Sequence, residues 1–301
     1  MIKSKPFFST LGGSGSFGNY SVFSLNDPVP ILSSSAYRPE RKTVFYVFGF
    51  GGKAEEKSVQ TIVEVYLGIA NICLLNWEKE ASTGILGPIS YPLTAISNAK
   101  RIGNEFGESL IKLHNAGLNL TDVHVIGFSL GGQLVGYTGR KVQEYDNILS
   151  RITGLEPAGP LYDGIISLRG LGASDASFVD IIHTNPNRLG SGEATGSVDI
   201  WVNCENSVQP GCDGSNFGMF IEKNLCSHDL SWKYFAEAIE HPSAYVARSA
   251  SSCEEWRSGQ ATDQTVFMGD EINTEARGSF YLRTNSEPPY GLGEDGSHPS
   301  S

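Results

Sequence analysis

The sequence predicts an α/β protein built on a mostly parallel central sheet with helices on both of its faces. Two observations support this class. Apolar runs of strand length alternate along the chain with segments of helical periodicity, which is the order typical of βαβ units. These runs are apolar at nearly every position, as expected for strands buried on both faces. The expected strands cover residues 43–52, 71–77, 123–129, 151–157 and 177–185.

Helices are expected to connect or follow these strands. They cover residues 88–116, 130–142 and 228–240. The first helix would have Pro88 and Pro92 in its opening turns and Gly117 as its C-cap. The glycine-rich residues 186–227 are expected to be irregular. The expected organisation is a loosely structured N-terminal segment over 1–24, a single domain over 25–290 and a flexible tail over 291–301.

The composition excludes several classes of function. The 301 residues carry a formal net charge of -11, so the phosphates of a nucleic acid would be repelled. No apolar stretch is long enough to span a bilayer, and residues 1–21 lack the apolar core of a signal peptide. The five cysteines are an odd number, so at least one thiol is expected to be unpaired within a monomer.

A Gly-x-Ser-x-Gly sequence occupies residues 127–131, between an expected strand and an expected helix. In α/β-hydrolases this sequence forms a sharp strand-to-helix turn that presents the serine oxygen above the sheet. The glycines are needed because side chains would clash there with the neighbouring strand and helix. Ser129 is therefore the candidate nucleophile. The alternative is a serine that only permits tight packing.

A serine nucleophile needs a general base, and α/β-hydrolases carry the triad in the chain order serine, acid, histidine. His228 fits this order. It follows a cysteine and begins an expected helix, where a bridged loop would hold the imidazole in place. His183 lies within an apolar strand and is expected to be a hydrogen-bonded core residue. The other histidines precede the nucleophile, share its strand or lie in proline-flanked connections: His114, His124, His241 and His298.

The acid that orients the base is expected at the end of the strand after the nucleophile helix. Glu156 occupies this place, and Asp180 and Asp199 are its alternatives. Two backbone amides are expected to bind the oxyanion of the reaction. One is the amide of Leu130, and the other lies in an early glycine turn, where Phe50 is the candidate.

Together these segments resemble the animal pancreatic-lipase family, which includes lipoprotein lipases and the insect and venom phospholipases A1. The resemblance covers roughly residues 25–290 and runs in order through TVFYVFGF, LLNWEKEA, HVIGFSLGGQLVGYTG, ITGLEPAGPLY, FVDIIHTN, QPGC and CSHDLSWKYF. It implies an α/β-hydrolase fold with a triad of Ser129, Glu156 and His228. The family normally has Asp at the acid position. The longer Glu156 side chain shifts the carboxylate by about one carbon–carbon bond, a change that we expect to be tolerated.

The resemblance also implies a lid and the disulfide that closes it. Cys212 and Cys226 would be bridged, and the loop of residues 213–225 between them is short, as in phospholipases A1. Some of its apolar side chains are candidates for contact with lipid or for packing onto the core: Phe217, Met219, Phe220 and Ile221.

No metal ion or other cofactor is expected. At the places that match the calcium loop of the family, only Asp175 remains, because Ser167, Gly170 and Gly172 fill the others. Calcium prefers carboxylate and carbonyl oxygens, which these residues do not supply as side chains.

The resemblance implies a secreted carboxylic ester hydrolase that acts on lipids at a lipid–water interface, of the phospholipase A1 type or the neutral glyceride lipase type. The alternative is a catalytically inactive lipid-binding or storage protein with the same fold, similar to the yolk proteins. Those proteins lack the nucleophile, whereas this chain has both Ser129 and His228, so we expect an enzyme.

Overall fold

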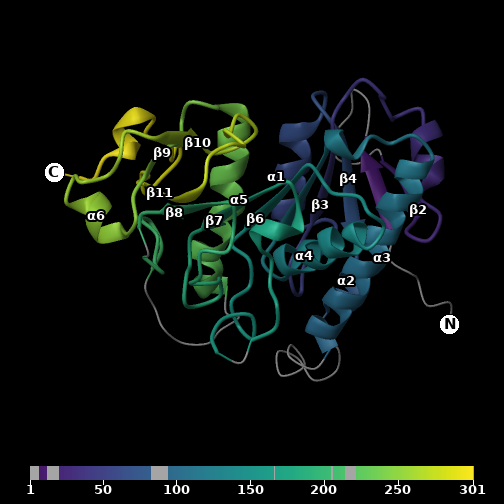
Figure 1. The fold of residues 1–301 in the computed structure, drawn as a ribbon, viewed down its shortest axis with the longest axis horizontal. Coiled ribbons are helices and arrows are strands. Elements are labelled where there is room, and N and C mark those ends of the chain that lie inside the picture. Colours follow the sequence, from purple (N-terminus) through teal and green to yellow (C-terminus); the bar gives the residue numbers. More distant parts are fainter. Residues whose placement is uncertain are drawn as a thin grey trace. The chain divides into compact units, whose positions relative to one another are not determined.

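The computed structural model describes residues 7–11, 20–82, 94–165, 167–204, 206–213 and 222–300 (Figure 1). The contacts between residues divide the chain into two compact units, where the sequence predicts one domain over 25–290. Unit 1 comprises the residues up to 153 together with 174–178, and unit 2 comprises 154–173 and the residues from 179 onward. Within the described residues, no helix is long and apolar enough to cross a membrane.

The strands of unit 1 follow the order β5-β3-β4-β1-β2. The ladders β5–β3 and β3–β4 are parallel, and the ladders β4–β1 and β1–β2 are antiparallel. The strands are β1 Phe7–Leu11, β2 Tyr20–Ser24, β3 Thr43–Val47, β4 Asn71–Asn76 and β5 Val123–Phe128. Every residue of β3 and of β5 is buried, which agrees with the continuous apolar sequence of these strands.

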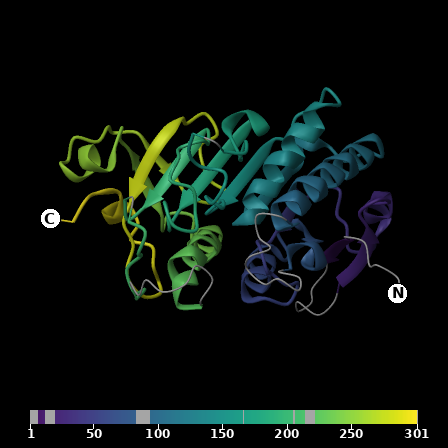
Figure 2. The ribbon, with the colours of Figure 1, turned by 90° about the horizontal axis from the view of Figure 1, so that it is seen from below.

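Helices cover both faces of the unit 1 strands. Figure 2 shows α3 and α4 side by side, on the face opposite α1. The helices are α1 Lys57–Tyr66, α2 Glu78–Ala81, α3 Ile96–Asn115 and α4 Leu130–Gln143, with the 3₁₀ turns η1 Val29–Ser33 and η4 Leu120–Asp122. The helices α3 and α4 approach closely at Gly103, where a Cβ atom would lie 2.5 Å from the carbonyl oxygen of Leu134.

The N-terminal part of unit 1 differs from the sequence prediction. The expected loose segment over residues 1–24 contains β1 and β2, which pair with each other and, through β1, with β4. The helix expected over 88–116 is α3, which begins at Ile96. Pro88 and Pro92 lie outside the described residues.

Strand β6 Arg151–Leu155 leads the chain from unit 1 into unit 2. The strands of unit 2 follow the order β10-β9-β11-β8-β7-β6. The ladders β7–β8 and β8–β11 are parallel, and β11–β9 and β9–β10 are antiparallel. The remaining elements are η5 Ala173–Asp175, β7 Phe178–His183, β8 Val198–Val202, α5 Glu222–Glu240, β9 Val246–Ser249, α6 Cys253–Arg257, β10 Thr265–Phe267, β11 Gly278–Leu282 and η6 Glu294–Ser297. The parallel ladders of both units confirm the predicted fold class.

Three predictions for unit 2 need correction. Residues 186–227 are not irregular throughout, because they contain the fully buried strand β8. Helix α5 begins at Glu222 and not at His228, so His228 lies inside the helix. The expected flexible tail over 291–301 contains η6, in which Gly296 and Ser297 are buried.

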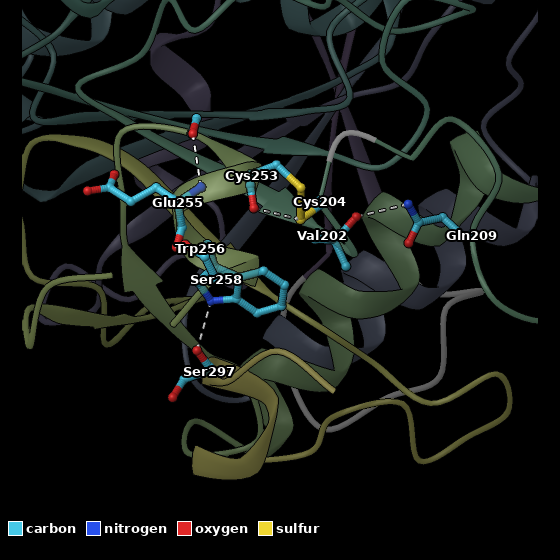
Figure 3. Close-up of a disulfide and its surroundings, with 9 residues drawn as sticks. Val202, Cys204, Gln209, Cys253, Glu255, Trp256, Ser258 and Ser297 are labelled. Carbon is cyan, nitrogen blue, oxygen red and sulfur yellow. Dashed lines mark hydrogen bonds between the residues drawn. A yellow bond between two sulfur atoms is a disulfide. The ribbon is translucent and has the colours of Figure 1, made fainter. Parts of the chain in front are cut away.

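Two disulfides stabilise unit 2. The Cys212–Cys226 bridge implied by the family resemblance is present. The second bridge joins Cys204, just after β8, to Cys253, the first residue of α6 (Figure 3). Close to this bridge, the indole N–H of Trp256 donates to the carbonyl of Ser297 at 2.9 Å (Figure 3). Cys73 on β4 is buried and carries a free thiol.

Candidate active site

The Gly-x-Ser-x-Gly sequence forms a strained turn between β5 and α4. Ser129 has φ 55° and ψ -123°, a conformation that residues other than glycine rarely adopt. The flanking residues must be glycine, because a Cβ on Gly127 would lie 2.4 Å from the carbonyl oxygen of Gly131. A Cβ on Gly131 would lie 2.3 Å from the carbonyl oxygen of Val47. The turn therefore holds a partly exposed serine at the N-terminus of a helix.

A second turn, residues 48–52, lies against Ser129 within unit 1. A Cβ on Gly49 would lie 2.7 Å from the Cβ of Ser129. The turn is held by Trp77, the residue after β4, because its indole N–H donates to the carbonyl of Phe48 at 3.0 Å and the two rings stack. Phe50 follows Gly49 in this turn, so the candidate donors Phe50 and Leu130 belong to two segments that meet at Ser129.

Glu156 follows β6 in unit 2 and is fully buried. Its φ is 48°, and its amide donates to the carbonyl of Ile182 at 2.8 Å. Its Oε2 accepts hydrogen bonds from the hydroxyl of Thr184 at 2.9 Å and from the amide of Thr184. Burial raises the pKa of Glu156 to about 7, against the lowering influence of the His183 charge and of the hydrogen bonds from Thr184 and Asn185.

The loop of residues 185–191 covers the Glu156 carboxylate. The amide of Ser191 donates to the carbonyl of Pro157 at 2.8 Å, which fixes the loop over the residues that follow β6. A Cβ on Gly190 would lie 1.4 Å from Oε1 of Glu156. The longer glutamate side chain therefore has room only because Gly190 has no side chain.

His228 lies on α5 and is buried. Burial lowers its pKa to about 3, so the imidazole is neutral at pH values near 7. An efficient general base has a pKa near the working pH, so this role requires a carboxylate that raises the pKa of His228. Two neighbouring bonds fix this part of α5. The hydroxyl of Ser231 donates to the carbonyl of His228 at 2.8 Å, and the amide of Gln209 donates to the hydroxyl of Ser227 at 2.9 Å. The side chain of Gln209 also donates to the carbonyl of Thr184 at 2.9 Å.

His183 is a hydrogen-bonded core residue, as predicted. Its Nε2 lies 2.8 Å from Oδ1 of Asp199 and its Nδ1 lies 3.2 Å from the carbonyl oxygen of Ser191. Asp199, one of the alternatives for the acid, is thus paired with His183. The other alternative, Asp180, is buried on β7. Sequence reasoning missed the His183–Asp199 pair, because the two residues lie on different strands and the second strand was not expected.

The structure brings together the predicted residues within each unit. Ser129 and Leu130 meet the turn that carries Phe50 in unit 1, and Glu156 meets Thr184 in unit 2, the unit that also carries His228. The predicted lid side chains lie outside the described residues: Phe217, Met219, Phe220 and Ile221. The last residues of the expected lid, 222–225, belong to α5.

Asp175, the remaining residue of the expected calcium loop, is buried and pairs with Arg140 at 2.6 Å. An acidic side chain already bound to a guanidinium has less capacity to hold a cation. In the part of the chain that the structure describes, no group of three or more His, Cys, Asp or Glu residues could hold a metal ion.

The strained serine turn between a parallel strand and a helix defines the class of the protein, an α/β-hydrolase. The family model described as Lipase matches residues 21–290, and the chain belongs to this family. A phospholipase A1 from Vespa crabro is 31% identical over 82% of this chain and 82% of its own length. Lipase member H from Mus musculus is 30% identical over 84% of this chain and 56% of its own length. Pancreatic triacylglycerol lipase from Oryctolagus cuniculus is 29% identical over 84% of this chain and 58% of its own length.

Proposed function

We propose that the protein is a carboxylic ester hydrolase that acts on lipids, with Ser129 as nucleophile, His228 as general base and Glu156 as the acid of the triad. The observation that carries this proposal is the strained conformation of Ser129 between two close-packed glycines. Backbone strain of this kind persists where function requires it. Membership of the lipase family supports ester hydrolysis, and the names of the relatives support a lipid substrate.

In the proposed reaction, the hydroxyl of Ser129 attacks the ester carbonyl while His228 takes its proton. The amides of Phe50 and Leu130 bind the oxyanion of the tetrahedral intermediate. The proton then passes from His228 to the leaving alcohol, and an acyl-enzyme remains. Water, activated by His228, attacks the acyl carbonyl and releases the fatty acid.

Glu156 stabilises the imidazolium form of His228 in this scheme, so it must be ionised. Its pKa of about 7 means that the carboxylate forms near neutral pH. Two features accommodate a glutamate at the position where the family normally has an aspartate. Gly190 leaves room for the longer side chain, and the hydroxyl of Thr184 donates a hydrogen bond to Oε2.

The substrate is a phospholipid cleaved by a phospholipase A1-type reaction or a neutral glyceride. The lid loop resembles that of the family, which supports contact of its apolar side chains with the lipid: Phe217, Met219, Phe220 and Ile221. Two disulfides support an extracellular location, because disulfides persist in oxidising compartments.

The test is release of fatty acid from phosphatidylcholine vesicles and from triacylglycerol emulsions by the disulfide-intact protein. We expect release from one of these substrates, its loss in Ser129→Ala and its retention in Ser167→Ala, a matched change of an exposed serine. Absence of release from both substrates, with lipid binding retained, would support the alternative of an inactive lipid-binding or storage protein.

A further inference from the structure

The hydrogen bonds of His183 favour a positive charge on its ring. Both ring nitrogens face acceptors, the carboxylate of Asp199 at 2.8 Å and the carbonyl oxygen of Ser191 at 3.2 Å. A carbonyl oxygen has no proton to donate, and Oδ2 of Asp199 already accepts from the amide of Gly196 at 3.0 Å. The Ser191 carbonyl therefore requires a proton on Nδ1 of His183. A second proton lies between Nε2 and Oδ1 of Asp199, and with that proton on Nε2 both ring nitrogens are protonated. A histidine that donates from both nitrogens is an imidazolium.

The surroundings of the ring also favour this positive charge. The imidazole of His183 stacks on the indole of Trp201, with ring centroids 3.8 Å apart and planes 8° apart. Aromatic faces attract cations. Full burial by itself would lower the pKa of His183, but the hydrogen bond and charge of Asp199, together with the charge of Glu156, raise it above the ordinary value.

Glu156 lies opposite His183, at the end of the neighbouring strand. The amide of Glu156 donates to Ile182, and the amide and hydroxyl of Thr184 donate to the Glu156 carboxylate. The two residues that flank His183 thus both bind Glu156. The charged groups that bear on His183 are Asp199 from β8 and Glu156 from the end of β6, and the charged group that bears on Glu156 is His183.

The loop of residues 185–191 contacts the side chains of both Glu156 and His183. Gly190 covers the carboxylate of Glu156, and the carbonyl of the next residue, Ser191, accepts from His183. A buried carboxylate loses the solvation that water would provide, and only a nearby positive charge or donated hydrogen bonds can replace it. Among the side chains that act on Glu156, His183 supplies the charge and Thr184 supplies the hydrogen bonds.

We propose that His183 is a positioning residue, a buried imidazolium whose charge favours the ionised form of the acid of the triad near neutral pH. This inference rests on the proposed function, in which Glu156 must be ionised to assist His228. It gives the buried His183–Asp199 pair a role in catalysis through Glu156.

The charge of His183 can be measured without any catalysis. In protein with ¹⁵N-labelled histidine, we expect both ring nitrogens of His183 to be protonated at neutral pH. His124 is the internal control, because it is also buried but its pKa lies well below the ordinary value, owing to burial and to the charges of Arg151 and Lys42. A single protonated nitrogen on His183 at neutral pH would overturn the proposal, whether or not the protein hydrolyses esters.

The effect on Glu156 is tested with His183→Gln, which can still donate to Asp199 but carries no charge. We expect the acid limb of the pH profile of kcat/KM to move to higher pH by about one unit or more, with activity at alkaline pH within about tenfold of the wild type. A purely packing role would lower activity at every pH and leave the limb in place, which would contradict the proposal.

Asp199→Asn is the second variant, and it tests the same proposal if His183→Gln does not fold. Without the carboxylate, His183 should lose its second proton at neutral pH, and the acid limb should move in the same direction. His124→Gln, which replaces a buried histidine bound to the hydroxyl of Thr153, should leave the limb in place. If the protein shows no ester hydrolysis at all, the titration of Glu156 is followed directly by the ¹³C NMR signal of its carboxyl group. A Glu156 titration that is unchanged in both variants would refute the inference.

Discussion

Replacement of Glu156 by Gln is expected to lower activity strongly and to remove a loss of stability that the wild type undergoes as the pH rises. Burial raises the pKa of Glu156 from 4.5 to about 7. The folded protein therefore keeps a proton that the unfolded chain has already lost in this interval, and its free energy of unfolding falls as the pH rises from 4.5 to 7. Over the whole interval the loss amounts to about 3 kcal/mol. The glutamine side chain of the variant would carry no charge at any of these pH values, so this loss should be absent.

The amide of the variant also brings a cost. Its oxygen can accept the bonds from Thr184, but its NH₂ group would take the place of Oε1, which is buried and has no hydrogen-bond partner among the described residues. An unsatisfied buried amide costs about 1–3 kcal/mol at every pH. This cost cancels when the difference between variant and wild type is compared at two pH values. We therefore compare the free energy of unfolding of the variant with that of the wild type. Between pH 4 and pH 8, the variant should gain about 3 kcal/mol relative to the wild type.

The assay is urea denaturation of both proteins at the two pH values, followed by tryptophan fluorescence, with fatty acid release measured in parallel. Activity should fall by roughly 10³- to 10⁴-fold in Glu156→Gln. Glu240→Gln, an exposed carboxylate of α5, controls for the loss of one negative charge. A stability difference between Glu156→Gln and the wild type that is the same at both pH values would refute the reasoning, as would full activity of the variant.

Three further predictions concern the same groups. In the wild type, kcat/KM should fall as the pH drops through about 7, because protonation neutralises Glu156; a profile that is flat down to pH 5 would exclude Glu156 as the acid. Gly190→Ala should displace the carboxylate that its Cβ would meet and lower kcat about tenfold or more, and wild-type kinetics would contradict this. Gly49→Ala should displace Ser129 and slow its labelling by fluorophosphonates by at least about tenfold, whereas an unchanged labelling rate would show that the turn can relax.

The fold was predictable where the sequence carries continuous apolar runs. Strands β3 and β5 are buried throughout, so nearly every residue contributes to the signal. Strand β8 was missed because it lies within a glycine-rich segment, a composition that predicts irregular structure. The start of α5 was missed because its first turn, at Glu222, is polar, so no apolar periodicity marks it.

The candidate site was predictable as a set of residue types in a fixed chain order, but the interactions of its residues were not. The chain order indicates Ser129 and His228, because α/β-hydrolases share one topology. It does not reveal that Gly190 covers Glu156, since the two residues are far apart in the sequence and meet only in the folded loop. Nor can the Cys204–Cys253 pairing be read from the spacing of cysteines.

Labelling of the disulfide-intact protein with a fluorophosphonate, followed by peptide mapping, tests the central claim most directly. The account predicts one covalent adduct per chain, on Ser129, with labelling lost in Ser129→Ala and strongly slowed when His228 is replaced by Ala. Ser167→Ala should be labelled at the wild-type rate. A folded wild-type protein that remains unlabelled, or that carries the adduct on another residue, would contradict the assignment of Ser129 as the nucleophile.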